Sequence, residues 1–227
     1  MFTNKSNQEE HWISVSDMMA GLMMIFLFIA IIYIQNISKY FDEISDVRSE
    51  ICSDLGKEFK NDSKKWGMSI CENGLLISFE GDSNFEINSA KLSERFRTIL
   101  NDFFPRLMHV IQKYNDSVSE LRIEGHTDSS IRRVDTVLSG YIYNTKLSQE
   151  RSRNVMDYAL GLESIKRNEY YLEWAYTHLT AHGLSSSQLI LNSKGREIGS
   201  ESRRVEFRIR TKQEDRLMDL VSEIKSK

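Results

Sequence analysis

The chain lacks an excess of positive charge, and this absence sets its first functional limit. Its 227 residues include 30 Lys and Arg against 33 Asp and Glu, which gives a formal net charge of −3. Proteins that attract nucleic acid or acidic lipid through an overall electrostatic field usually carry a basic surplus. We therefore expect no nucleic-acid partner.

Cysteine and histidine are scarce, and their spacing argues against metal and redox sites. Only two cysteines and five histidines occur, and Cys52 and Cys71 have neither CxxC spacing nor a neighbouring His. His126 stands beside Asp128 without a positioned Ser or Cys, and Glu124 with Asp128 belongs to the same short motif. No phosphate-binding loop is evident. We expect no metal, no cofactor and no enzymatic activity.

Internal repeats and low-complexity linkers are also absent from the sequence. A chain of this length can form one full domain with accessory segments, but hardly two independent cores. A single main domain is therefore expected.

One long apolar run determines the broad class of the protein. Residues 13–34 read ISVSDMMAGLMMIFLFIAIIYI, and a helix of this length, at about 1.5 Å per residue, can cross a hydrocarbon core of about 30 Å. The run is long for a cleavable signal peptide, and polar residues follow it instead of a small-residue cleavage site. We predict an uncleaved transmembrane helix over residues 12–35, preceded by a tail over residues 1–11. The few charges in the tail leave the orientation open.

Asp17 is the one charged residue in this run. A charged side chain at the bilayer centre costs about 2.5 to 3.5 kcal/mol on insertion scales, so such a residue usually faces protein or water and has a function. Alternatively, Asp17 or Ser16 caps the start of the helix at the membrane interface. The chemistry alone leaves both interpretations open.

The segment WISVSDMMAGLMMIFLF resembles the transmembrane signature of stator B subunits, in which a Trp precedes an Asp and a Met-rich stretch of small residues. These subunits include flagellar MotB and, as the nearer resemblance, ZorB of the Zorya anti-phage defence systems. The resemblance implies that Asp17 binds and releases an ion, expected to be a proton, beside a partner subunit. It also implies a homodimer within a multi-span MotA- or ZorA-like A subunit, expected to be a pentamer. The location would be the bacterial inner membrane, with residues 1–11 cytoplasmic and the C-terminal domain periplasmic.

Apolar residues continue beyond the membrane segment at helical spacing. They are Ile37, Phe41, Ile44, Val47, Ile51, Leu55 and Phe59. Such a stripe could pack on the domain or join two parallel copies as a short coiled coil. We expect the second, with residues 36–66 forming a periplasmic helical linker, plug and dimer stalk. A disulfide between Cys52 and Cys71, a Cys52 bridge between two copies, and two independent thiols remain open.

The rest of the chain alternates predicted strands and helices. The strand-like segments are LLISF, LRIEG, LILNSKG and RRVEFRIR. One amphipathic segment begins at Ser89 and contains Pro105, which should kink or divide it, and another helix opens at Ser148. The predicted fold class is α+β, with a single transmembrane helix, a helical linker and an α/β sandwich with helices on one face over residues 67–212. A C-terminal helix follows over residues 213–227.

Four blocks in this region match the OmpA C-terminal-like pattern in order, over about residues 73–210. They are IEGHTD, NTKLSQERSRNVMDYAL, NSKGRE and SRRVEFRI. The resemblance implies a peptidoglycan-binding domain in which Asp128 and Arg151 bind the diaminopimelate of the stem peptide, supported by Thr127 and Asn144. The chemistry fits, because the free end of diaminopimelate is a zwitterion that a carboxylate and an arginine can bind together. A structural salt bridge between Asp128 and Arg151 is the other interpretation.

Two stretches depart from this pattern. The segment SSIRRVDTVLSGYIYNTK, between HTD and LSQER, is several residues longer than in typical members, so affinity or ligand preference could be altered. The segment IKRNEYYLEWAYTHLTAHG is also enlarged, and its aromatic residues suggest packing or a partner surface.

Together these features predict the B subunit of an ion-driven inner-membrane stator, anchored to peptidoglycan and acting in anti-phage defence. The alternatives are a flagellar MotB-like stator subunit and a passive OmpA-like envelope tether without ion transport. The motif around Asp17 favours a stator over a tether.

Overall fold

The structure is a computed structural model in which residues 6–72, 74–81, 84–86, 89–130 and 136–225 are described. The chain divides into two compact units, Met1–Ser45 and Asp46–Lys227. Part of the predicted tail and part of the long segment after Asp128 lie outside the described residues.

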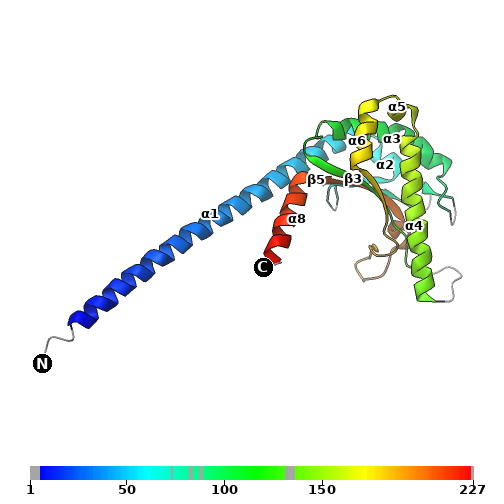
Figure 1. Cartoon of the computed structure of the whole chain (residues 1–227). Coiled ribbons are helices and arrows are strands. Elements are labelled where there is room, and N and C mark those ends of the chain that lie inside the picture. Colours follow the sequence, from blue (N-terminus) through cyan, green and yellow to red (C-terminus); the bar gives the residue numbers. More distant parts are fainter. Residues whose placement is uncertain (1–5, 73, 82–83, 87–88, 131–135, 226–227) are drawn as a thin grey trace. The chain divides into compact units, whose positions relative to one another are not determined.

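The first unit consists of the N-terminal part of helix α1, which runs from Ser6 to Glu58 and continues into the second unit (Figure 1). Large apolar side chains are exposed along it from Val15 to Ile34. Among the described residues, this is the one helix that is long and apolar enough to cross a membrane. The exposed apolar side chains need an apolar surrounding, which a bilayer supplies.

The second unit is built on a five-stranded sheet with the order β1-β2-β5-β3-β4. Strands β3 and β4 pair in parallel, and the other neighbours pair antiparallel. The strands are β1 Met68–Ile70, β2 Leu76–Glu80, β3 Val118–Gly125, β4 Leu179–Gly183 and β5 Arg204–Thr211.

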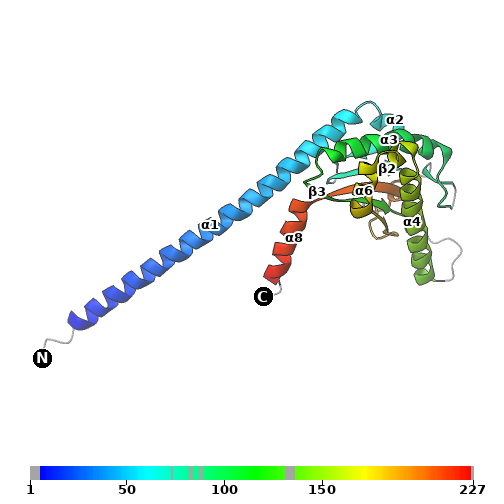
Figure 2. The ribbon, with the colours of Figure 1, turned by 45° about the horizontal axis from the view of Figure 1, so that its top comes forward.

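Three main helices accompany this sheet (Figure 2): α3 Glu94–Gln112, α4 Val137–Leu160 and α6 Glu169–His178. The shorter helices are α2 Ser63–Trp66, α5 Glu163–Lys166 and α7 Gly199–Ser202, and the chain continues into α8 Lys212–Lys225. The predicted α+β class, with one long apolar N-terminal helix, is confirmed.

The alternation of residues along the strands explains why the helices share one face. Leu121 and Ile123 of β3 are fully buried in the core with Phe207 of β5 and with apolar residues of α3 and α4. The intervening residues of β3, including Glu120 and Arg122, are charged and form ion pairs with each other. Successive strand residues point to opposite faces, so the sheet has one apolar face for the helices and one charged face.

The end of α1 and the residue after it belong to this core. Ile51, Leu55 and Phe59 are 0% exposed, and the Phe59 ring lies 5.1 Å from that of Phe103. This part of the apolar stripe therefore packs on its own domain. The expected coiled coil between two copies does not use these three residues. The compact unit accordingly begins at Asp46 and includes much of the predicted linker.

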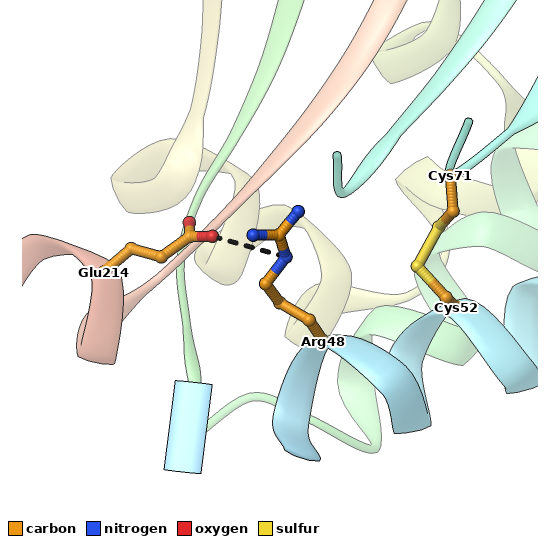
Figure 3. Close-up of a disulfide and its surroundings, with 4 residues drawn as sticks. All are labelled: Arg48, Cys52, Cys71 and Glu214. Atoms are coloured by element: carbon orange, nitrogen blue, oxygen red, sulfur yellow. Dashed lines mark ion pairs between the residues drawn. A yellow bond between two sulfur atoms is a disulfide. The ribbon is translucent and has the colours of Figure 1, made fainter. Parts of the chain in front are cut away.

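A disulfide and an ion pair fasten the end of α1 to the domain (Figure 3). Cys52 and Cys71 are joined with their Cα atoms 6.0 Å apart. One turn before Cys52, Arg48 pairs with Glu214 at 3.7 Å. These contacts tie α1 to the residue after β1 and to α8.

We expect reduction of the disulfide to lower the free energy of unfolding by about 3 kcal/mol, because a cross-link over 19 positions limits the unfolded chain. Guanidinium unfolding of the full-length protein in detergent, with and without reductant, measures this difference. The Cys52→Ser, Cys71→Ser double variant is the control and should not respond to reductant. Equal stability of fully reduced and oxidised wild type would contradict the prediction.

Two predicted helix features differ from the structure. Pro105 lies inside a continuous α3, where buried Phe104 and Leu107 on either side anchor the helix to the core. Helix α4 begins eleven residues before Ser148, because Thr136 and Ser139 form a capping box at its start. The predictions relied on single residues, a proline and a serine that can open a helix, and core contacts and the capping box outweigh these local signals.

The predicted strand LILNSKG is wrong. The side chain of Asn192 accepts hydrogen bonds from the backbone N–H groups of Lys194 and Arg196, at 2.9 and 3.0 Å, and turns the chain back. Asn side chains often compete with strand pairing in this way. Two strands were missed: β1, which pairs with β2, and β4, LTAHG, which pairs with β3.

Candidate functional site

Helix α4 lies unusually close to the ends of β3 and β4. A Cβ atom at Gly125 would lie 2.4 Å from the carbonyl oxygen of Ser148, and one at Gly183 would lie 2.3 Å from the backbone nitrogen of Gln149. Glycine is therefore needed at both strand ends for this approach. The approach brings the face of α4 that carries Asn144 beside the loop that leaves β3.

This loop and this helix face form a small pocket that contains all four predicted ligand-binding residues. Thr127 and Asp128 come from the loop, and Asn144 and Arg151 come from α4. The tertiary structure thus brings together residues from two separate sequence blocks. The other residues that line the pocket are Ser130, Tyr143, Leu147 and Arg203.

Asp128 is oriented by several contacts. Its carboxylate forms an ion pair with Arg203 and accepts a hydrogen bond from the backbone N–H of Ser130 at 3.3 Å. Asn144 Nδ2 donates to the Asp128 carbonyl oxygen at 3.2 Å. The side chain of Asp128 is 13% exposed. Asp128 therefore pairs with Arg203, a residue that the sequence analysis had not connected with it.

Arg151 is positioned by a different part of the chain. Its Nε donates to the Ser89 carbonyl oxygen at 3.1 Å, and its guanidinium carbon lies 4.7 Å from the centre of the Phe85 ring. One turn along α4, Asn154 Nδ2 donates to the Ala90 carbonyl oxygen at 2.8 Å. Stacking on an aromatic ring and hydrogen bonding fix the plane of the guanidinium at the pocket wall.

Thr127 supplies a buried polar group. It is 3% exposed, and its backbone N–H donates to the Ser185 carbonyl oxygen at 2.9 Å. Within the described part of the chain, its Oγ1 atom has no hydrogen-bond partner. A buried hydroxyl without a partner costs free energy, so a polar ligand in this pocket would relieve that cost.

Asp17 lies in the other unit, on α1, five residues after Trp12. Its side chain is exposed, as are those of Met18 and Met19. A carboxylate in this position needs a polar or protein surrounding if the helix spans a membrane.

A second group of ionisable residues, Glu124, His126 and Glu206, is buried on the charged face of the sheet. The His126 Nε2 atom lies 3.5 Å from Glu206 Oε2 and 3.8 Å from Glu124 Oε2. Three protein ligands could hold a metal ion, but arginines already neutralise the two carboxylates. Arg204 Nε lies 2.6 Å from Glu206 Oε1, and Arg208 contacts Glu124 and Glu206 at 2.9 and 3.0 Å. This group is therefore a structural charge network.

The stability of this network should depend on pH. Burial would raise the pKa of Glu206, but His126 and the Arg204 guanidinium outweigh burial and lower that pKa from 4.5 to about 2. A lowered folded-state pKa adds stability above pH 4.5, and this stability is lost as the pH falls toward 2.

Between pH 5 and pH 3 the free energy of unfolding should therefore fall by about 2 kcal/mol more in the wild type than in Glu206→Gln. Chemical unfolding at several pH values measures both proteins. Parallel curves for the two proteins would show that Glu206 does not titrate in this way.

No protein-family model matches the chain. The Zorya protein ZorB of Escherichia coli is 34% identical to it over 227 residues, which cover 96% of this chain and 95% of that protein. The chain belongs to the ZorB family. The match spans both units of this ZorB-family chain, the apolar helix and the sheet domain. The resemblance seen in the sequence is therefore confirmed at the level of the family.

Two solved structures resemble the fold of this ZorB-family chain. The cell wall anchor of the T6SS from Pseudomonas aeruginosa is 22% identical, with 67% of this chain and 94% of that chain covered and a TM-score of 0.44. A putative MotB like protein from Desulfovibrio vulgaris is 19% identical, with 74% and 93% covered and a TM-score of 0.49. At these values the likeness concerns the fold alone.

Arg203 is a charged residue of the ZorB-family pocket that motif matching did not single out. It stands in the block SRRVEFRI, just before β5. Strands β3 and β5 are antiparallel, with Gly125 opposite Val205, so residue 203 lies across from the loop that carries Asp128. Pairing the two predicted strands in this register would have revealed it.

Proposed function

We propose that this ZorB-family chain is the B subunit of an ion-driven stator in the bacterial inner membrane, acting in anti-phage defence. Residues 12–35 cross the membrane, the N-terminus is cytoplasmic, and the sheet domain lies in the periplasm. There the domain anchors the complex to peptidoglycan. The partners are a second copy of the chain, joined through the segment just beyond the membrane, and a pentamer of a multi-span A subunit.

The convergence of four residues on one pocket carries the anchoring part of the proposal. The sequence blocks that resemble OmpA suggested Asp128, Arg151, Thr127 and Asn144, and the same four residues line the pocket. Asn144 orients the loop through the Asp128 carbonyl group. The other three residues offer a carboxylate, a guanidinium and a buried hydroxyl to a ligand.

These groups suit the free end of diaminopimelate, which carries an ammonium group and a carboxylate on one carbon. Asp128 would accept hydrogen bonds from the ammonium, and Arg151 would bind the carboxylate through its planar fork. Arg203, which pairs with Asp128, adds a second guanidinium beside the ligand carboxylate. Thr127 Oγ1 would gain a polar partner.

Asp17 carries the ion-transport part of the proposal. It is the one acidic or basic residue between Trp12 and Tyr33. An acid in an apolar span can alternate between a neutral and a charged form as its surroundings change. In a stator, the A subunit would supply those surroundings, and the wall anchor would hold the complex against the reaction force.

Sedimentation with purified sacculi tests the anchoring function. Full-length protein in detergent should sediment with diaminopimelate-type sacculi but remain in the supernatant with lysine-type sacculi. The lysine side chain ends in an ammonium group without the carboxylate that Arg151 would bind. Equal sedimentation with both types would contradict the proposed recognition, and no sedimentation with either would contradict wall anchoring.

A further inference from the structure

The N-terminal part of α4 exposes an unusual number of apolar side chains. Figures 1 and 2 show this end of the helix extending beyond the strands. Val137 is 77% exposed and Ile142 is 59% exposed. We call the exposed set the apolar ridge, and it consists of Val137, Leu138, Tyr141, Ile142 and Tyr143.

The apolar ridge is held in place by hydrogen bonds. The capping box of Thr136 and Ser139 fixes the helix start, and Ser185 Oγ donates to the Tyr141 carbonyl oxygen at 3.4 Å. Gly140, on the opposite side of this turn, is buried. Contiguous exposed apolar side chains on an ordered element usually mark a surface that binds a partner.

The ridge is continuous with the pocket. Tyr143 belongs to both, because it lines the pocket together with Asp128 and Arg151. The pocket is small, so a bound diaminopimelate end must leave the rest of its stem peptide and the attached glycan strand outside. A part of the polymer that extends from the pocket toward the start of α4 reaches the apolar ridge first.

The chemistry of the ridge favours one part of this polymer. Residues 136–145 include no charged side chain, so this surface offers nothing to a highly charged partner. A glycan strand presents apolar C–H faces and acetyl methyl groups. Tyrosine rings can cover such faces while their hydroxyls stay in water, and aliphatic side chains can pack against the methyl groups.

We propose that the apolar ridge binds the glycan strand of peptidoglycan next to the stem peptide held in the pocket. This inference rests on the proposed wall-anchoring function and extends it. The pocket recognises the peptide, and the ridge adds contact with the sugar chain. The ridge lies in the segment in which this chain is longer than the OmpA-like pattern, so the extra residues would enlarge the binding surface.

Two probes separate the ridge from the pocket: diaminopimelate-type sacculi and a free diaminopimelate-containing stem peptide without sugars. The test variant is Leu138→Ser with Ile142→Ser, both exposed and outside the pocket. Its affinity for sacculi should fall by about tenfold, which corresponds to about 1.4 kcal/mol. Its affinity for the free peptide should not change. Lys146→Ser, an exposed site on the same helix, is the matched control and should bind both probes like wild type.

Each other outcome overturns the inference in a recognisable way. If the variant binds sacculi like wild type but changes oligomeric state in light scattering, the ridge is an interface between copies. An equal loss for both probes, with an unchanged melting temperature, would make the ridge part of the peptide site. If wild type binds both probes and the variant is unaffected in every assay, only the ridge inference fails. If wild type binds neither probe, the wall-anchoring function fails as well.

Discussion

Asp128→Asn and Arg151→Gln should each nearly abolish binding of the full-length protein to diaminopimelate-type sacculi. Each change leaves one charge of the bound zwitterion without a partner. Loss of one partner of a desolvated charge pair typically costs about 2 to 5 kcal/mol, or roughly 30-fold to several thousandfold in affinity. Co-sedimentation over a range of protein concentrations measures the loss.

The control for this experiment lies on the same helix. Arg153→Gln removes an arginine that is largely exposed and pairs with Asp157 outside the pocket, so it should bind sacculi like wild type. Thermal melts should accompany each measurement, because Asp128→Asn also removes the partner of Arg203. If folded Asp128→Asn and Arg151→Gln proteins still bound sacculi, these residues would have only a structural role.

Asp17→Asn should reduce ion-dependent activity to the level of cells that lack the protein. The amide has nearly the same shape as the carboxyl group, but it cannot take up and release a proton at physiological pH. With the A subunit co-expressed, the efficiency of phage plating measures defence, and membrane fractionation shows whether insertion is preserved.

Asp116→Asn is the matched control for Asp17→Asn. It removes an exposed acid that lies outside the apolar run, outside the segment just beyond the membrane and outside the pocket, and it should leave defence unchanged. Full defence by a correctly inserted Asp17→Asn protein would exclude the transit role and favour a passive tether. If the activity that the Asp17→Asn variant loses were swimming and not phage resistance, the flagellar alternative would be correct.

Several features could be predicted from the sequence because their physical causes are local. The apolar run of α1 requires only length and composition. The alternation of apolar and charged residues in LRIEG and RRVEFRIR indicates strands with one buried face, and both segments are strands in the structure. The four motif residues were identified because short blocks of residue types were compared with a family pattern.

Other features depended on contacts between distant segments. The helical spacing of Ile51, Leu55 and Phe59 predicts an apolar stripe but not what covers it, and their own domain covers them. Strand β4 has little β-forming signal of its own and depends on pairing with β3. In LILNSKG, the side-chain hydrogen bonds of Asn192 decide against a strand.

The sequence by itself determined the apolar helix with its single acid, the α+β class, the family, and the residue types suited to a zwitterionic ligand. The tertiary structure decided how these residues combine. Gly125 and Gly183 let α4 approach the ends of two strands, and this approach places Arg151 in the same pocket as Asp128. Strand register adds Arg203 to that pocket. Local sequence specifies the chemistry of each side chain, but only long-range packing sets which side chains meet.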